Sequence, residues 1–567
     1  MNTPTEWCRM QVSELQRRLA RKATDKPEHR FTKLYDLLTW EPLMAWAFDK
    51  LMTNAGSRTA GIDRMDKRKA LHNRDLIIAE LRVALKSGTY KHQPVRRVFI
   101  PKANGKRRPL GIPTLTDRMV QMMVKAILEP IFESDFRPES HGFRPQRSCH
   151  TALAHLHQLT APRQKKMNWV IEGDITGCFD HIQHTTLTRL LRRRLQDHKL
   201  MGIIWQMLQA GVMEGTLFTT TSEGTPQGGI VSPLLANIYL HELDLWFHQN
   251  YTGLNYNEKN RRRKRKEGNA FYVRYADDFV VAWNGTREGA EQLKAALTTF
   301  LREHLGLELS AEKTRITHVT DGYDFLGFTV KRYRNRSGGS TLITRPSEKS
   351  VMKLKVKIKT MTKHGTTRDA VRDKITAMNY LTRGWANYFR HSAASGTLRY
   401  VSHYAFKRVE IWLRAKTRQG SKAIYGSYYR RDPHGHLTWS AGGQHLHLPT
   451  YTKIERLRYA HRPNPYLTEP EVSPLTHNEA PFGTKEWGGA HYYGEGWTEI
   501  RAAVLERDER TCRTCGKKGK VEVHHIRPWK PGMAHELTNL ITLCGTCHRQ
   551  VRDPKSEVNR QLARMTP

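Results

Sequence analysis

The stretch Phe271-Tyr-Val-Arg-Tyr-Ala-Asp-Asp-Phe-Val-Val281 decides how this chain is expected to fold. Two runs of aromatic and β-branched residues flank an adjacent pair of acids, Asp277 and Asp278, which is the pattern of a β-hairpin with charges at its turn. The two carboxylates repel each other, and a hard divalent cation with oxygen ligands would relieve that repulsion. A solvated acidic turn is the alternative, and the apolar flanks argue against it. The pair is therefore predicted to form half of a Mg2+ site.

A third carboxylate, Asp174, follows the apolar run 169–171, which predicts a strand that ends near the acid. Phosphoryl transfer from a nucleoside triphosphate uses two metal ions about 3.5–4 Å apart that share carboxylates. Tyr-Ala-Asp-Asp at 275–278, together with Asp174 and the Phe179 that follows it, resembles the catalytic motifs of reverse transcriptases. The resemblance implies an RNA-directed DNA polymerase in which the three acids hold two Mg2+ ions.

The overall charge points to a polyanionic partner. The 567 residues include 94 Lys and Arg against 54 Asp and Glu, a formal net charge of +40. Lys and Arg displace counterions condensed on phosphates, so an excess of this size favours nucleic acid over a merely solvated surface. Six consecutive cations, Arg261-Arg-Arg-Lys-Arg-Lys266, are expected to form a solvated, RNA-contacting loop. No apolar run approaches a membrane span and no signal peptide begins the chain, so we expect a cytoplasmic protein without a membrane partner, associated with the nucleoid when bound to DNA.

A basic hairpin is predicted before the acidic motifs. Strand-like residues at 95–113 surround Asn104-Gly105, a strong signal for a two-residue turn. Resemblance to the fingers of reverse transcriptases implies that Lys102 and Arg108 contact the triphosphate of the incoming dNTP. An exposed charged turn is the alternative for each of them.

Three further nucleotide contacts are implied by the same resemblance. Phe179 would lie under the sugar and exclude a 2′-hydroxyl, and an ordinary core Phe is the alternative. Gln227 would lie near template and nucleotide within Gly224-Thr-Pro-Gln-Gly-Gly229, whose glycines allow the backbone to approach a ligand closely. Lys313 would give a proton to the departing pyrophosphate, and a surface Lys is the alternative.

The chain becomes helical from about residue 346. An amphipathic stripe there predicts a helix with one buried face, and it consists of Ile375, Met378, Leu381, Trp385, Tyr388 and Phe389. Within it, Arg383-Gly-Trp-Ala-Asn-Tyr-Phe-Arg390 resembles the thumb of group II intron maturases, which implies that structured intron RNA is gripped by phosphate and shape contacts. Residues 421–495 mix aromatic and basic side chains, as suits single-stranded or distorted DNA, and the family has a DNA-binding segment here. A linker with short strands is the alternative.

Two Cys-x-x-Cys knuckles near the C-terminus predict a zinc site. Cys512 and Cys515 form the first, and Cys544 and Cys547 form the second. Four thiolates make a closed tetrahedral site, so this zinc should be structural. A redox pair would need only one knuckle, and disulfides are rare in a reducing compartment.

Histidines between and after the knuckles resemble the HNH nucleases. The order is His524-His525, then Asn539, then His548 directly after the second knuckle. The resemblance implies that His525 is the general base, that Asn539 positions it, and that His524 and His548 hold one divalent ion. The family often has Asp where His524 stands.

Together these motifs predict an α+β fold with five parts. These are an N-terminal helical extension at 1–90, fingers and an antiparallel palm sheet of a right-hand polymerase at 91–345, a helical maturase thumb (X domain) at 346–420, a DNA-binding segment at 421–495 and a zinc-stapled ββα HNH nuclease at 496–567. Ala60-Gly-Ile-Asp63 also resembles the N-terminal extension of group II intron proteins. The resemblance implies a group II intron-encoded protein that binds its intron RNA in a ribonucleoprotein, nicks target DNA and copies the intron with dNTPs.

Three other protein classes are alternatives. A free homing nuclease would not need the palm. A retron- or CRISPR-associated reverse transcriptase would share the three acids, but the maturase-like helix and the HNH-like module fit it poorly. A splicing-only RNA-binding maturase would share the helix but would not need Asp174, Asp277 and Asp278 together.

Overall fold

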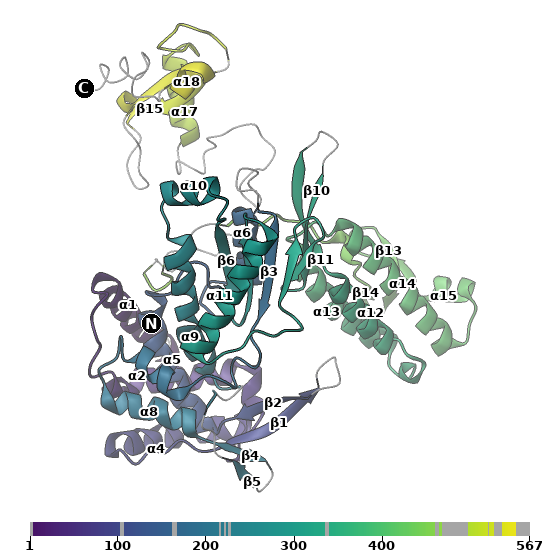
Figure 1. The fold of residues 1–567 in the computed structure, drawn as a ribbon. Helices are drawn as coiled ribbons and strands as arrows, with labels where there is room; N and C mark the ends of the chain where they lie inside the picture. Colours follow the sequence, from purple (N-terminus) through teal and green to yellow (C-terminus); the bar gives the residue numbers. More distant parts are fainter. Residues whose placement is uncertain are drawn as a thin grey trace. The chain divides into compact units, whose positions relative to one another are not determined.

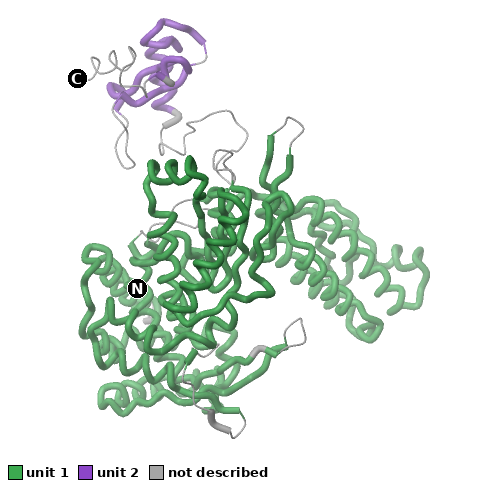
Figure 2. The backbone as a smooth tube through the Cα atoms, viewed as in Figure 1, with its two compact units in different colours: residues 1–475 green, residues 476–567 purple. Residues whose placement is uncertain are grey.

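The computed structural model describes residues 4–101, 107–160, 167–214, 217–219, 223–224, 228–334, 339–459, 464–467, 497–519, 521–526 and 536–550. The chain divides into two compact units, residues 1–475 and residues 476–567 (Figure 2). Helices and antiparallel sheets occur in both units, which confirms the α+β class.

The N-terminal part of unit 1 is helical, as predicted. Its helices and helical turns are α1 (Pro4–Asp25), η1 (Tyr35–Thr39), α2 (Glu41–Thr53), η2 (Ala55–Arg58), α3 (Lys67–His72) and α4 (Arg74–Ser87). Helices α1 and α2 pack on α5 (Leu115–Glu133), which is buried on nearly every face, including polar side chains such as Asp117 and Gln121. Asp63, from the predicted extension motif, accepts a hydrogen bond from the Leu115 N–H at 2.7 Å and so joins the extension to the start of α5.

The predicted basic hairpin is present. Strands β1 (Val95–Pro101) and β2 (Arg107–Ile112) pair antiparallel, with Ile100 opposite Arg108. Short strands β4 (Val212–Glu214) and β5 (Leu217–Thr219) extend the sheet, in the order β2-β1-β4-β5.

The acidic motifs lie in a second antiparallel sheet, called here the carboxylate sheet. Its strands run in the order β6 (Ala270–Tyr275), β7 (Asp278–Trp283), β3 (Trp169–Asp174) and β8 (Arg315–His318). Alternate residues of a strand point to opposite faces, and here both faces are buried. One face packs on α9 (Ser232–Phe247) and α11 (Arg287–Leu305), and the other packs on α6 (Cys149–Thr160) (Figure 1). Burial on both sides explains why these strands are continuous apolar runs.

The basic run at 261–266 was expected to be a loop, and that prediction is wrong for most of it. Helix α10 (Tyr256–Lys264) begins at Asn255, whose side chain forms a reciprocal capping box with Glu258. The cations at 261–264 fall in the last turn, where the partial negative charge of the helix terminus favours them. The remaining helices of this region are α7 (His184–Leu191), α8 (His198–Gln209) and the short π-helix η4 (His248–Thr252).

A three-stranded sheet and a helical bundle follow. The sheet has the order β11 (Ser340–Pro346), β10 (Phe328–Arg334) and β9 (Tyr323–Phe325). The bundle consists of α12 (Glu348–Met361), α13 (Val371–Phe389) and α14 (Ser395–Thr417), joined by the turn η5 (His364–Thr366). Ile375 and Met378 of the predicted stripe are fully buried, and the bundle core also includes Trp412 and Trp439.

Residues after α14 fold against this bundle. They form α15 (Ser421–Tyr428), β12 (Tyr429–Arg431), β13 (Leu437–Ala441), β14 (Gln444–His445) and η6 (Pro449–Tyr451). Beyond them Glu455 pairs with Arg390, and the ring of Tyr459 stacks on His155 with centroids 4.0 Å apart. This part of the chain therefore returns from the bundle to α6, the helix that packs on the carboxylate sheet.

Unit 2 contains a ββα arrangement. Strands β15 (Val521–His525) and β16 (Leu540–Cys544) pair antiparallel, with α17 (Trp497–Arg507) before them, the turn η7 (Leu537–Asn539) between them and α18 (Gly545–Gln550) after them. Within the described part of the chain, no helix is both long enough and apolar enough to span a bilayer.

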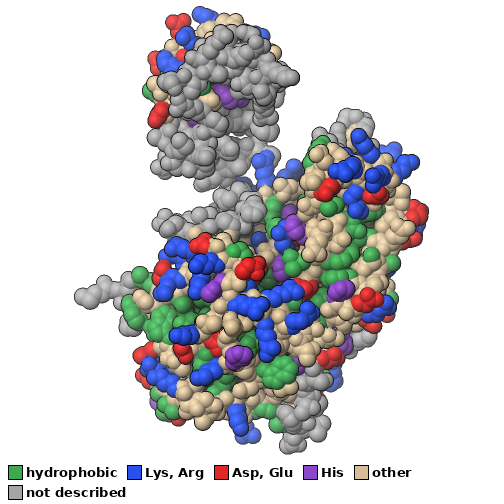
Figure 3. All heavy atoms as spheres, turned by 60° about the vertical axis from the view of Figure 1, so that its left-hand side comes forward, with side chains coloured by type: hydrophobic (Ala, Val, Ile, Leu, Met, Phe, Trp, Pro, Cys, Tyr) green, Lys and Arg blue, Asp and Glu red, His purple; other side chains and the backbone are tan. Residues whose placement is uncertain are grey.

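Lys and Arg side chains occur in several groups on the face of unit 1 that Figure 3 presents.

Candidate active sites

Three predicted acids meet at one edge of the carboxylate sheet. Asp174 ends β3 and is the direct partner of Asp278, which begins β7. Asp278 is also paired with Tyr275, so that Ala276 and Asp277 form the turn between β6 and β7. Strand pairing therefore brings together acids that are far apart in the sequence.

The charges at this edge are closely coupled. Burial, Asp174 and Asp277 raise the pKa of Asp278 to about 7, with Lys313 opposing the shift. The Lys313 Nζ lies 2.7 Å from the Asp174 Oδ2. A divalent cation among these oxygens would remove the repulsion that raises this pKa, so the donor set fits Mg2+.

Phe179 is half-buried at the margin of the main core. Its ring meets the exposed ring of Phe143 edge to face, with centroids 6.4 Å apart. One side of Phe179 is thus packed in the protein and the other faces the residues of the loop around Phe143.

The remaining predicted nucleotide contacts are only partly described. Lys102 and Gln227 lie outside the described residues, as does the side chain of Arg108. Two glycines near Gln227 lie close to the backbone of other parts of the chain. A Cβ on Gly224 would lie 2.8 Å from the Asp180 carbonyl oxygen, and one on Gly228 would lie 2.6 Å from that of Gly111.

Sequence reasoning gave no role to Arg274, although it lies inside the motif that decided the fold. Its side chain is fully buried and forms an ion pair with Asp244 of α9 at 2.6 Å. A charged residue between apolar neighbours of a strand buried on both faces is itself a signal, because a buried charge must be paired.

In unit 2, two of the predicted nuclease histidines lie together. The His524 Nδ1 is 3.0 Å from the His548 Nε2, and the His548 Nδ1 is 2.7 Å from the Glu522 Oε2. Burial and the neighbouring His548 and His525 lower the pKa of His524 to about 4. A neutral imidazole keeps a free lone pair, so this pair fits a divalent ion. Glu522, two positions before His524 on the same strand face, was not singled out from the sequence.

His525 is buried and lies on β15 opposite Leu540. Asn539 directly precedes Leu540, and its carbonyl oxygen accepts a hydrogen bond from the Ile526 N–H at 2.9 Å. The hairpin thus brings the chain segments of His525 and Asn539 next to each other.

The four knuckle cysteines form one cluster. Their sulfur atoms all lie within 4.8 Å of one another, and the sulfurs of Cys515 and Cys544 are 3.7 Å apart. A tetrahedron with zinc–sulfur bonds of about 2.3 Å has edges of about 3.8 Å, so the cluster fits zinc. Burial opposes ionisation of Cys512, but backbone N–H groups, led by that of Cys544, outweigh it and lower the pKa of the thiol to about 6.

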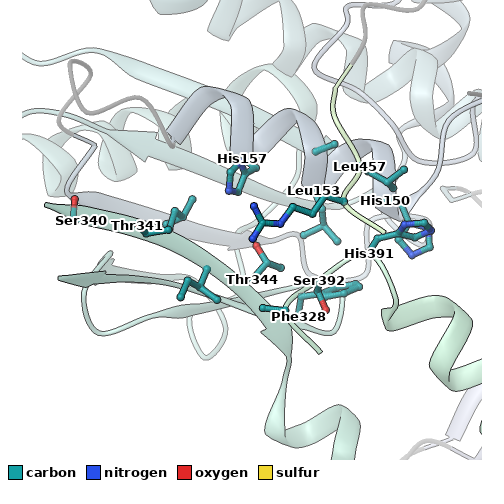
Figure 4. A pocket seen from close by; sticks show the side chains of 15 residues that line it. His150, Leu153, His157, Phe328, Ser340, Thr341, Thr344, His391, Ser392 and Leu457 are labelled. Carbon is teal, nitrogen blue, oxygen red and sulfur yellow. The ribbon is translucent and has the colours of Figure 1, made fainter. Parts of the chain in front are cut away.

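A cavity of about 370 Å³ lies elsewhere in unit 1, between α6, the β10–β11 hairpin and residues 391–393 and 456–457 (Figure 4). Two of its histidines are hydrogen-bonded to backbone. The His150 ring is paired with the Tyr388 carbonyl oxygen and the His391 ring with that of Glu455. Among the described residues that line this cavity there is no predicted site residue and no carboxylate.

Comparison with protein families divides the chain into three consecutive matches. Residues 100–330 match the reverse transcriptase (RNA-dependent DNA polymerase) family, and residues 351–429 match the group II intron maturase-specific domain. Residues 512–553 match the HNH endonuclease family. The carboxylate sheet, nearly all of the helical bundle and the β15, β16 and α18 elements of unit 2 thus each fall within one match.

Individual relatives cover most of the chain. Group II intron-encoded protein LtrA of Lactococcus lactis subsp. cremoris is 30% identical over 94% of this chain and 98% of its own length. Protein YkfC of Escherichia coli K12 is 39% identical over 60% of this chain and 94% of its own length. A putative COX1/OXI3 intron 2 protein of Saccharomyces cerevisiae is 25% identical over 94% of this chain and 67% of its own length. The chain therefore belongs to the group II intron-encoded proteins, with a reverse transcriptase, a maturase-specific domain and an HNH endonuclease on one polypeptide.

Proposed function

We propose that this protein splices its intron RNA, nicks one strand of a target DNA and copies the intron from the new 3′ end by target-primed reverse transcription. The observation that carries the polymerase part is the direct pairing of Asp174 with Asp278, with Asp277 in the adjoining turn. The nuclease part rests on the His524–His548 pair and on the family match of unit 2.

At the polymerase site, Asp174, Asp277 and Asp278 would hold two Mg2+ ions. Bound there, the ions would activate the primer hydroxyl and neutralise the leaving pyrophosphate. Lys313 gives a proton to the pyrophosphate, and Phe179 excludes the 2′-hydroxyl of a ribonucleotide. Contacts to the incoming nucleotide come from Lys102, Arg108 and Gln227.

At the nuclease site, His525 takes a proton from the attacking water and Asn539 orients it. His524 and His548 would hold the divalent ion, which would stabilise the leaving oxygen. Zinc on Cys512, Cys515, Cys544 and Cys547 would be structural, because four thiolates leave no open position.

The nucleic-acid partners are assigned by region. Intron RNA is gripped by the bundle, where Lys353, Lys357 and Lys359 are exposed on α12. Target DNA is bound through residues 421–495, and this segment is anchored on the bundle because its own Trp439 and Leu446 pack into the bundle core. The five parts at 1–90, 91–345, 346–420, 421–495 and 496–567 correspond to the extension, fingers and palm, thumb, DNA-binding segment and nuclease of a right-hand polymerase with an appended HNH domain.

The test is primer extension on an RNA template by Asp174→Asn and Asp277→Asn, with intron RNA binding measured on the same preparations. Both variants should lose DNA synthesis and keep RNA binding, because the metal ligands are lost while the bundle is untouched. Asp180→Asn is the matched control, since Asp180 is an exposed acid on the loop that follows Asp174. Normal extension by either metal-ligand variant would overturn the assignment.

A further inference from the structure

The buried guanidinium of Arg274 forms a two-point ion pair. Arg274 lies on β6 three positions before Asp277, and its side chain has no exposed surface. The Nε donates to the Asp244 Oδ1 at 2.8 Å, and the Nη2 donates to the Oδ2 at 2.6 Å. Burial alone would raise the pKa of Asp244, but Arg274 outweighs it and lowers the pKa to about 2. Both groups therefore stay charged inside the protein.

The other donors of this guanidinium reach the catalytic turn and its supports. The Nη1 donates to the Ala276 carbonyl oxygen and to the Asn237 Oδ1, each at 3.0 Å. The Nη2 also donates to the Ser140 Oγ at 2.8 Å. Arg274 thus joins α9 and the segment around Ser140 to the backbone that immediately precedes Asp277.

The segment 139–142 is hydrogen-bonded to Arg274 and lies close to the turn. The Arg274 N–H donates to the Glu139 carbonyl at 2.9 Å, and the Arg274 carbonyl accepts from the His141 N–H at 2.8 Å. The Asn237 Nδ2 donates to the Gly142 carbonyl at 2.8 Å. A Cβ on Gly142 would lie 2.3 Å from the Ala276 nitrogen, so only glycine allows this approach.

The turn needs such support because its backbone is strained. Ala276 has φ 58°, in the left-handed region that residues with a Cβ rarely adopt. A strained conformation persists only where its surroundings hold it, and strain of this kind gathers at functional sites. The Arg274 bond to the Ala276 carbonyl is a direct restraint on that peptide.

We propose that Arg274 is a positioning residue of the polymerase, whose guanidinium fixes the Ala276–Asp277 turn so that Asp277 and Asp278 converge with Asp174. This inference rests on the proposed metal-binding role of the three acids. The contribution of this ion pair to folding stability does not explain the arrangement, because the free energy lost in desolvating a buried ion pair is about as large as the free energy gained from its attraction. The five directed N–H groups of Arg fit the five acceptor atoms here, which come from four residues, and the three donors of Lys do not.

The decisive variant is Arg274→Lys, which keeps a positive charge for Asp244 and loses the planar fork. The Mg2+ concentration for half-maximal extension should rise about 10–100-fold, as when partners that orient metal ligands are removed. The rate at saturating Mg2+ and dNTP should fall about 10²-fold for a displacement of the reacting groups near 1 Å. The KM for dNTP and the affinity for intron RNA should stay close to those of the wild type.

A second readout does not depend on activity. Mg2+ bound to the folded protein raises its melting temperature, and Arg274→Lys should need about 10–100-fold more Mg2+ for the same rise. The matched control is Arg194→Lys, which alters another buried guanidinium, paired with Asp135 at 3.0 Å and with the Ala23 carbonyl at 2.8 Å. Its melting temperature should fall while its Mg2+ requirement stays that of the wild type.

If Arg274→Lys does not fold, Asn237→Ala tests the same restraint, because it keeps the ion pair and removes the bonds to the Nη1 and to Gly142. An unchanged Mg2+ requirement in the folded variant, or an equal shift in Arg194→Lys, would overturn the positioning role. The activity of Asp277→Asn distinguishes a failure of the positioning role from a failure of the proposed metal site. If Asp277→Asn is inactive and Arg274→Lys is normal, only the inference fails; if Asp277→Asn is active, the assignment of the metal site fails first.

Discussion

Asp174 and Asp278 are directly paired residues on the adjacent strands β3 and β7. Because the pairing is antiparallel, the end of β3 and the start of β7 lie at the same edge of the sheet. Asp277 is next to Asp278 in the turn, so the three acids lie at the same edge of the sheet, and each is partly buried. The consequences are electrostatic and can be measured.

Mg2+ binding should weaken as the pH falls. The pKa of Asp278, raised to about 7 by burial, Asp174 and Asp277, means that this carboxyl is protonated below about pH 7 in the metal-free protein. Mg2+ must then displace a proton, so the apparent affinity should fall by up to about tenfold per pH unit below 7 and level off above it. Mg2+ titrations of the melting temperature on both sides of pH 7 measure this. Asp278→Asn should bind weakly with a smaller pH dependence, and a flat profile in the wild type would contradict the prediction.

Phe179→Ala should relax sugar selection. The ring is half-buried and meets the exposed ring of Phe143, so truncation should remove the group that is proposed to exclude a 2′-hydroxyl. Incorporation of ribonucleotides relative to deoxynucleotides should increase. Phe143→Ala is the control, because it removes the edge-to-face partner of Phe179 and leaves the ring in place. An unchanged ratio in Phe179→Ala would mean that this residue only packs.

Gly173→Ala should destabilise unit 1. A Cβ at Gly173 would lie 2.1 Å from the buried ring of Phe279, and overpacking of this kind costs about 1–3 kcal/mol. The free energy of unfolding in urea measures it. Gly202→Ala is the control, since nothing lies within 4 Å of its Cβ and alanine favours the helix α8. Adding Phe279→Leu to Gly173→Ala should recover part of the lost free energy of unfolding. Equal stabilities of the two glycine variants would contradict the predicted clash with Phe279.

The knuckle cysteines should hold one zinc per chain. Zinc binding contributes on the order of 10–16 kcal/mol in small zinc domains, far more than the small core of unit 2 supplies. Elemental analysis of the full chain should show one zinc, and Cys512→Ser should lose it and expose unit 2 to protease. Cys178→Ser, at a buried cysteine of unit 1, should keep the metal. A protease-resistant unit 2 without zinc would contradict the prediction.

His525→Ala should separate the two chemistries. A general base contributes about 10²–10⁴-fold, so nicking of target DNA should fall by that factor. Extension of an annealed primer and splicing should stay normal, because His525 belongs to unit 2 and the three acids belong to unit 1. A pre-nicked target should restore copying. Normal nicking would show that His525 is not the general base. Failure to copy from the pre-nicked target would show that the two activities are not independent.

Local patterns in the sequence determined much of the fold. Apolar runs on each side of Asp277 predicted the β6–β7 hairpin, Asn104-Gly105 predicted the β1–β2 hairpin, and the stripe from Ile375 to Phe389 predicted α13. These features depend on periodicity and turn chemistry within a few residues, which the sequence contains directly. The clustering of the four cysteines followed similarly from the knuckle spacing.

Only the tertiary structure decided which distant residues meet. The basic run at 261–266 became part of a helix because of a capping box that its composition did not reveal. The partners of Arg274 come from α9 and from the segment around Ser140, and no spacing rule connects them to β6. A periodic pattern specifies which side of an element is buried, whereas the choice of neighbour depends on how the whole core packs. The sequence by itself therefore determined the acids and their turn, and the packing of the core decided what holds that turn in place.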